Sequence, residues 1–234
     1  MKFAVGSSNN EIGSLLQKNS GLVRNIFILL IVQLLITGLV AHFTISKKKT
    51  KKSTSSMSGR EVGLAILMFM AVFVIAWLMV SIIMDETKNP ALRIFLFTII
   101  SVLMGLSLSY VKTLPAKVVA MATLGTITAF VVMGAIGYYI ASKNINLRPM
   151  EIWLFAGLII LIIASIVIWF AFPDEPIARR VITALFVCLF SLYIMYDTNQ
   201  ILMNQIDYIG GAFSYYIDII NIFEDLLYLM SDNS

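Results

Sequence analysis

The sequence predicts an all-α integral membrane protein, a bundle of seven transmembrane helices with the last helix at its centre. Hydrophobic residues make up 59% of the 234 residues and charged residues only 13%, whereas a soluble domain carries about 25% charged residues. The mean hydropathy is +0.91. The apolar residues gather in long segments joined by short polar links. This distribution is typical of a chain that crosses a bilayer repeatedly.

The chain opens with a polar N-terminal segment, residues 1–21, which reads MKFAVGSSNNEIGSLLQKNSG. It lacks an apolar run of the about 7 to 15 residues that a signal peptide needs. We therefore expect this segment to remain attached. Residues 22–234 are expected to form a single seven-helix transmembrane domain.

Seven apolar segments approach or exceed the about 20 residues that a helix needs to cross the hydrocarbon core. Four of the five prolines come just before an apolar run, where a helix tolerates proline best, and no segment is interrupted by one. This pattern favours one compact helical domain. In order, the expected spans are Leu22–Ile45, Val62–Met84, Ala91–Val111, Ala116–Ala141, Ile152–Phe172, Ile177–Tyr196 and a weaker Gly211–Met230.

Small residues spaced four apart predict where these helices pack against each other. Helices in lipid associate through close packing, and small side chains let two backbones approach. The expected packing faces are Ser101, Gly105 and Ser109 in the third span, and Gly125 with Ala129 and Gly137 with Ala141 in the fourth.

Acidic residues inside the last apolar segment predict its place in the bundle. Asp218, Asn221 and Asp225 fall at positions i, i+3 and i+7 and share one stripe of a helix, with Glu224 on its flank. A charged side chain at the bilayer centre costs about 3 kcal/mol on insertion scales. A lipid-facing helix with these groups would not insert stably, so we expect the other helices to surround it.

A second carboxyl group, Asp197, is expected to meet Asp218. The last two spans are joined by the short NQILMNQIDYIGG, in which we expect Gly210 and Gly211 to turn the chain. An antiparallel hairpin then places the two aspartates at similar depths on adjacent helices. Two carboxyl groups at close range in a poorly solvated site share a proton and titrate as a coupled pair. Once ionised, they form an oxygen ligand suited to Ca²⁺.

These segments resemble a known family. FSLYIMYDTNQI and SYYIDIINIFEDLL are similar to the two signature segments of the Bax inhibitor-1 family, the transmembrane BAX inhibitor motif proteins. This family includes the Golgi anti-apoptotic proteins and bacterial calcium-leak members. GLVRNIFILLIVQLLIT resembles its opening span, with Arg24, Gln33 and Thr37 in register, and TLGTITAFVVMGAIGYYIASKNI resembles its fourth span.

The resemblance implies a pH-sensitive Ca²⁺ leak channel, gated by a dyad that maps onto Asp197 and Asp218. A shared proton closes the pore, and the ionised pair binds Ca²⁺ as the transported ion. The implied partners are the lipid bilayer, calcium, protons and apoptosis-regulating membrane proteins. We expect no cofactor, no enzymatic activity and no nucleic acid. The expected location is the endoplasmic reticulum or Golgi in a eukaryotic or viral setting and the plasma membrane in a prokaryote.

The chain departs from the family pattern in two places. Residues 63–84 hold no ionisable side chain, so an arginine in the second span that latches the dyad in some members has no counterpart there. Conversely, Glu224 and Asp225 are two further acidic residues after Asp218, where relatives are usually less acidic. With Asn221 they predict a cation path toward the C-terminal face. The alternative is a pair of interfacial carboxylates near a helix end.

The sequence also bears on other functions of membrane proteins with several helices. Tyr196 and Asp197 fit one half of an intramembrane aspartyl protease, but the Gly-x-Gly-Asp of its other half is missing around Asp218. A retinal protein needs a lysine in the last span, and none follows Lys143. Two alternatives stay open: a non-conducting membrane interaction protein that regulates cell death, and a proton-coupled cation exchanger.

Overall fold

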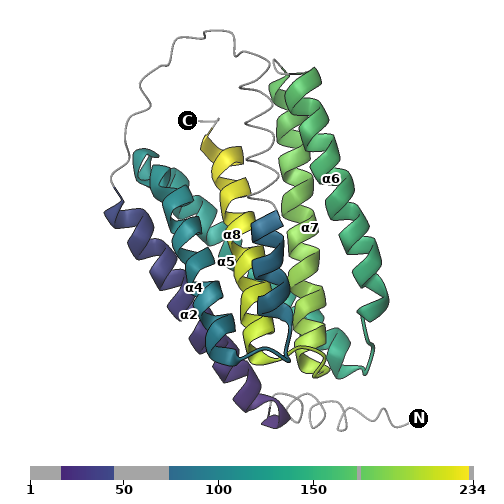
Figure 1. Cartoon of the computed structure of the whole chain (residues 1–234). Helices are drawn as coiled ribbons and strands as arrows, with labels where there is room; N and C mark the ends of the chain where they lie inside the picture. Colours follow the sequence, from purple (N-terminus) through teal and green to yellow (C-terminus); the bar gives the residue numbers. More distant parts are fainter. Residues whose placement is uncertain (1–16, 45–73, 173–174, 232–234) are drawn as a thin grey trace, which may run out of the picture. The chain divides into compact units, whose positions relative to one another are not determined.

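The computed structural model describes residues 17–44, 74–172 and 175–231, and every regular element in them is a helix (Figure 1). The all-helical class is therefore confirmed. The helices are α2 (Ser20–Phe43), a helix at Val74–Met84, α4 (Pro90–Ser107), α5 (Ala116–Ser142), α6 (Glu151–Ala171), α7 (Pro176–Leu202) and α8 (Tyr208–Ser231), with short 3₁₀ helices η1 (Leu108–Thr113) and η2 (Arg148–Met150).

Five of the described helices are long and apolar enough to cross a membrane, and they match five of the expected spans. The protein is thus an integral membrane protein. The apolar helix Val74–Met84 is shorter, because the first part of the expected span Val62–Met84 lies outside the described residues. α8 has 24 residues, enough to span, but it carries three acidic side chains. The matching spans are Ser20–Phe43, Pro90–Thr113, Ala116–Ser142, Arg148–Ile168 and Pro176–Leu202.

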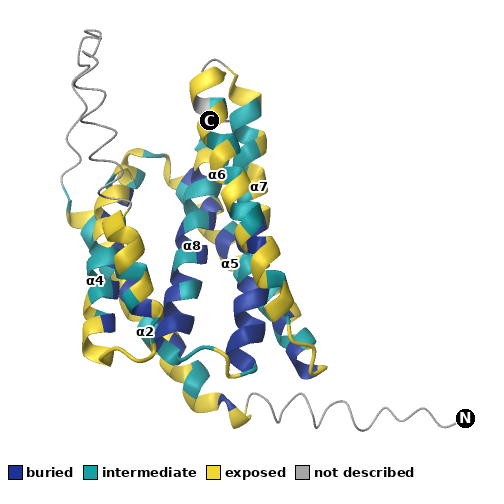
Figure 2. Ribbon diagram, turned by 45° about the vertical axis from the view of Figure 1, so that its right-hand side comes forward, coloured by how far each residue is buried: buried dark blue, intermediate teal, exposed yellow. Residues whose placement is uncertain are grey.

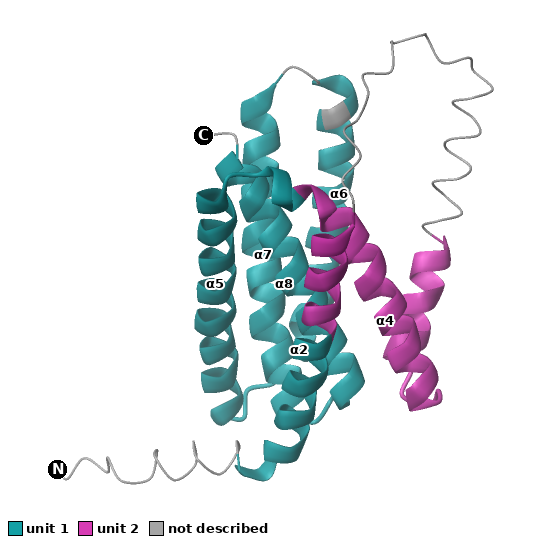
Figure 3. Ribbon diagram, turned by 90° about the vertical axis from the view of Figure 1, so that its left-hand side faces the viewer, with its two compact units in different colours: residues 1–32, 111–234 teal, residues 33–110 magenta. Residues whose placement is uncertain are grey.

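The chain divides into two compact units, residues 1–32 with 111–234 and residues 33–110 (Figure 3). The boundary falls within α2, between Val32 and Gln33. The expectation that residues 22–234 form a single domain stays a prediction. Most of the expected polar segment 1–21 lies outside the described residues.

In the first unit, α8 packs against both α5 and α7, and α6 packs against α7. Burial is concentrated along α8 and the second half of α7 (Figure 2), where Ile194, Tyr216 and Ile222 have no exposed surface. A Cβ atom at Gly137 of α5 would collide with the carbonyl oxygen of Met195 in α7. This glycine lets the two backbones touch, as its small-residue spacing predicts.

The connection from α7 to α8 differs from the expected one. Gly210 and Gly211 do not turn the chain; they lie in the first turn of α8, and no described glycine has a positive φ. The turn instead uses Asn204, whose φ of 55° lies in the left-handed region. Asparagine adopts this conformation more readily than most residues. Asp207 then caps α8, since its Oδ1 accepts from the Gly210 N–H at 2.9 Å. Gly211 serves helix packing, since a Cβ there would lie 2.9 Å from Ile26 Cδ1.

In the second unit, polar groups join the second half of α2 to α4. The Thr37 hydroxyl donates to the carbonyl oxygen of Ser101 at 3.0 Å, and the Gln33 amide donates to the Thr98 hydroxyl at 3.1 Å. A Cβ at Gly105 would lie 2.7 Å from the Thr37 carbonyl oxygen. Ser101 and Gly105 are therefore a packing face, as expected, and Ser109 lies beyond α4 in η1.

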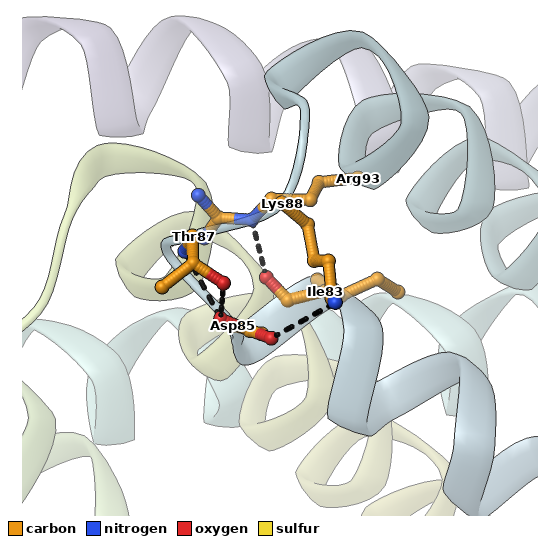
Figure 4. Close-up of polar contacts among 5 residues, drawn as sticks. All are labelled: Ile83, Asp85, Thr87, Lys88 and Arg93. Carbon is orange, nitrogen blue, oxygen red and sulfur yellow. Dashed lines mark hydrogen bonds and ion pairs between the residues drawn. The ribbon is translucent and has the colours of Figure 1, made fainter.

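A buried arginine that the sequence analysis did not single out organises the turn before α4 (Figure 4). Arg93 is 1% exposed, and its Nε donates to the Ile83 carbonyl oxygen at 2.7 Å. The helix dipole favours a cation at the C-terminal end of the Val74–Met84 helix. Nearby, the Asp85 carboxylate accepts from the Thr87 backbone and hydroxyl, which lowers the pKa of Asp85. Lys88 Nζ lies 3.7 Å from the Asp85 carboxylate.

Candidate functional site

The structure brings Asp197 of α7 and Asp218 of α8 together inside the first unit. Asp197 is 5% exposed and Asp218 is 4% exposed, and their carboxyl groups contact each other. The helix α7 continues to Leu202, so Asp197 lies within it rather than at its end. The hairpin geometry expected from the sequence is thus present.

The pair is closely enclosed. Within the described residues, the Asp218 Oδ2 atom has no hydrogen-bond partner. A buried carboxylate without a donor is costly, and two adjacent carboxylates repel each other strongly in a medium of low dielectric constant. A single proton held between the carboxyl groups removes the repulsion and supplies a donor. The arrangement can therefore hold a proton or, once ionised, attract a cation.

The residues that follow Asp197 tie this end of α7 to the loop between α5 and α6. Asn199 has no exposed surface; its amide donates to the Ile145 carbonyl oxygen at 2.8 Å and accepts from the Leu147 N–H at 2.9 Å. Gln200 donates to the Asn146 side chain at 3.1 Å. These bonds satisfy the fully buried amide group of Asn199. They also tie the helix that carries Asp197 to the loop.

Hydroxyl groups surround the pair on both helices. The Thr198 and Tyr215 hydroxyl groups are hydrogen-bonded at 2.7 Å, which joins α7 to α8 one residue from Asp197. The Tyr196 hydroxyl shares a hydrogen bond with Glu151 at the start of α6. Each residue of the segment YDTNQ therefore contacts a different neighbour, and the segment connects α7 with α8, α6 and the loop after α5.

The residues of the expected cation path do not join the pair. The Asn221 amide donates to the carbonyl oxygen of Ile217 in its own helix at 2.8 Å. Glu224 and Asp225 are half-buried. Asp225 follows Asp218 by seven residues, about 10 Å along a helix. This part of α8 packs its Leu227 against Val118 and Ala122 of α5.

The capacity of the site for a metal ion is limited to what two carboxyl groups offer. Among the described residues, no three His, Cys, Asp or Glu side chains are grouped to hold a metal ion. Ca²⁺ takes about six to eight oxygen ligands in a resident site. Asp197 and Asp218 could thus supply only part of the shell of a passing Ca²⁺ ion, with water completing it.

Several residues that build the site were not named from the sequence. In the sequence, Thr198, Asn199 and Gln200 stand out only as part of a family signature, and Glu151 lies just before the expected span Ile152–Phe172. One signal could have found the first three: consecutive polar residues at the end of an apolar span need partners if they are buried. Their actual partners lie 17 to 54 residues away in sequence, beyond the reach of local patterns.

Comparison with known proteins shows the family of the chain. The model of the family described as inhibitor of apoptosis-promoting Bax1 matches residues 19–234. The chain belongs to this family, the Bax inhibitor-1 family. Among similar proteins of this kind is a BI1-like protein of Arabidopsis thaliana, 25% identical over 220 residues that cover 90% of this chain and 80% of that protein.

Two further relatives come from other kingdoms. Protein lifeguard 3 of Homo sapiens is 28% identical over 223 residues, which cover 91% of this chain and 68% of the human protein. A membrane protein of Vibrio cholerae is 25% identical over 194 residues, which cover 81% of this chain and 86% of that protein. The family resemblance drawn from the two aspartate-bearing segments is confirmed.

Proposed function

We propose that this member of the Bax inhibitor-1 family is a pH-sensitive Ca²⁺ leak channel whose gate is the Asp197–Asp218 pair. One observation carries the proposal: two buried carboxyl groups face each other across adjacent helices inside a membrane protein. Buried ionisable residues in the helices of a membrane protein normally line an ion or proton pathway.

The gate would work through the charge of the pair. With a proton between them, the two carboxyl groups hold α7 and α8 together and offer little attraction to a cation. Loss of that proton leaves two adjacent negative charges in a dry site, where their repulsion is strong. The helices then separate or a Ca²⁺ ion neutralises the charge, since carboxylate oxygens are its preferred ligands.

We further propose that seven helices form the channel and that α8 is its axis. Two features support this. α8 packs against both α5 and α7, and buried side chains occur all around its first half, including Tyr215, Tyr216 and Asp218. A helix facing lipid would be buried along one stripe only.

The cellular role proposed here follows the family. The family description names inhibition of apoptosis-promoting Bax1, which supports a role in limiting cell death in organisms that have that machinery. A leak would act there by lowering stored Ca²⁺. Apoptosis-regulating membrane proteins are then the expected partners, in the endoplasmic reticulum or Golgi; in a prokaryote the protein would lie in the plasma membrane. We propose no enzymatic reaction and no resident cofactor.

The direct test is Ca²⁺ flux into proteoliposomes loaded with a calcium-sensitive dye, measured across a range of pH. The native protein is compared with Asp197→Asn and Asp218→Asn. We expect a pH-dependent flux that both substitutions change, because each leaves one ionisable group in place of two. Asp85→Asn is the matched control, since it makes the same chemical change at a carboxyl group in a loop and should leave the pH profile intact.

Two outcomes would replace the proposal. A folded native protein that conducts no Ca²⁺ at any pH would favour the non-conducting interaction protein. A Ca²⁺ flux that drives a matched counterflow of protons, read with a pH-sensitive dye in the same vesicles, would favour the exchanger. Flux with an unchanged pH profile in both aspartate variants would leave a channel but remove the dyad as its gate.

A further inference from the structure

A pocket of about 270 Å³ lies among α2, α5, α7 and α8 of the first unit. Val23 contributes from the beginning of α2, Tyr138 from near the end of α5, and Leu202 from the end of α7. Because all three lie near helix ends, the pocket is close to one surface of the membrane rather than at its centre. Gly134 of α5 forms part of the wall.

The interior of this pocket suits an apolar ligand. Its walls include Ile26, Phe130 and Ile201, and its hydroxyl groups already have partners. Thr198 and Tyr215 are hydrogen-bonded to each other at 2.7 Å, and Thr198 also lies 2.7 Å from the Ile194 carbonyl oxygen. An engineered apolar cavity of about 150 Å³ is known to stay dry and to bind benzene. A larger apolar pocket has room for part of a hydrocarbon chain.

The pocket opens onto the surface that faces the bilayer. Val131 and Phe27 line it and are 60% and 39% exposed on helices that cross the membrane. Exposed side chains on such helices contact lipid, so the mouth is continuous with the lipid interface. A lipid chain can therefore enter sideways from the leaflet without passing through water.

Cationic side chains lie at the same end of these helices. Arg24 is exposed one turn before Phe27 and Ile28 and so shares their outward stripe. Lys143, also exposed, follows the last residue of α5. Basic residues at a membrane surface attract lipid phosphate groups. The charge at the mouth thus matches a phospholipid headgroup, while the interior matches its hydrocarbon.

We infer that this pocket binds one acyl chain of a phospholipid from the adjacent leaflet, with the lipid phosphate beside Arg24. The bound chain would fill the space between α2 and the α7–α8 pair and support the Thr198–Tyr215 hydrogen bond at its inner wall. Binding does not require that the protein conduct ions, so it can be tested separately from the proposed function.

The test is photolabelling in vesicles of phosphatidylcholine and phosphatidylglycerol that contain a trace of phosphatidylcholine with a diazirine in one acyl chain. After illumination, labelled peptides are located by mass spectrometry. We expect labels on pocket residues such as Val131 and Ile201 at several times the level on Leu124, which is 66% exposed on the same helix as Val131. Leu124 reports ordinary contact with bulk lipid.

A filling substitution makes the assignment specific. A Cβ at Gly134 would meet only Thr198 Oγ1, at 3.8 Å, so Gly134→Leu can extend into the pocket. It should lower pocket labelling about tenfold, because displacing roughly two methylene groups removes that much affinity. Gly38→Leu is the matched control, since a Cβ there meets nothing within 4 Å. Ala135→Leu, on the same wall, replaces Gly134→Leu if the latter fails to fold by circular dichroism.

Three results would overturn the inference. Pocket residues could be labelled no more than Leu124, which would make the pocket ordinary lipid-facing surface. Labelling could persist unchanged in a folded Gly134→Leu protein. Finally, a diazirine fatty acid could label the pocket where the phospholipid does not, which would assign the site to a free fatty acid instead.

Discussion

Two acidic pairs in the same unit differ sharply in their surroundings. Asp197 and Asp218 lie on two helices, are almost fully buried and contact each other. Glu224 and Asp225 are neighbours in one helix, where successive side chains point about 100° apart, and both are half-buried. Two carboxyl groups that are adjacent in the chain are therefore not brought into contact by the helix that carries them. Packing of two helices brings such groups into contact.

The packing around the two pairs differs as well. The end of α7 beside Asp197 is held by hydrogen bonds from Thr198 and Asn199 to other elements. The stretch of α8 around Glu224 and Asp225 is held by an apolar cluster that includes Leu227. One pair is therefore fixed in a polar network, and the other lies on a helix whose position does not depend on it.

The largest expected effect on Ca²⁺ flux is a coupling between the two buried aspartates. In a double-mutant cycle on Ca²⁺ flux, the double variant Asp197→Asn/Asp218→Asn should be little worse than either single variant, because both singles already destroy the shared-proton pair. We expect a coupling of about 1.5 kcal/mol, or roughly tenfold in rate. Purely additive effects of the two substitutions would contradict a shared function.

The hydrogen bonds that hold the helix carrying Asp197 can be removed without changing either aspartate. Asn199→Ala should lower the free energy of unfolding by about 1 to 3 kcal/mol, because it removes the two hydrogen bonds that the fully buried Asn199 side chain makes with Ile145 and Leu147. The measurement is denaturant unfolding in detergent. Asn221→Ala is the control: its amide contacts only a carbonyl of its own helix, and we expect a loss below about 1 kcal/mol. Equal losses would show that the two asparagines are equivalent.

A smaller effect is expected at the second acidic pair. If Glu224 and Asp225 line a cation path toward the C-terminal face, the double variant Glu224→Gln/Asp225→Asn should reduce Ca²⁺ flux about twofold to threefold, because their negative charge raises the local cation concentration. The two single effects should add, unlike those of the buried aspartates. Unchanged flux in the double variant would remove these residues from the path.

The smallest effect is expected at Asp85, an exposed carboxyl group outside the spans. Its pKa lies below the ordinary 3.8 because Thr87 donates to the carboxylate. A carboxyl group whose pKa is lower in the folded state than in the unfolded state stabilises the fold at pH values above the unfolded-state pKa. This contribution disappears as the pH falls through the folded-state pKa. Asp85→Asn should therefore be slightly less stable than native protein near neutral pH, and the difference should disappear in acid, once the Asp85 carboxyl group is protonated in the folded protein. A stability difference between the two proteins that grows in acid would show that Thr87 does not lower the pKa of Asp85.

Much of the fold was predictable because it depends on the solvent rather than on distant contacts. A bilayer forces each crossing segment to be a helix of about 20 apolar residues, and that length can be counted in the sequence. The pairing of Asp197 with Asp218 was also predictable, since a short connection between two spans leaves few ways to arrange them. The expected turn at Gly210 and Gly211 was wrong, because glycine permits close helix packing as well as turning.

The class of protein, most of its spans and the two aspartates that meet can thus be read from the sequence. The structure adds the contacts that hold their helices: Asn199 bonds to the loop after α5, and Tyr196 bonds to Glu151 of α6. The physical reason is the range of the interactions. The length of an apolar segment depends only on consecutive residues, whereas a buried hydrogen bond needs a partner that folding brings from elsewhere in the chain.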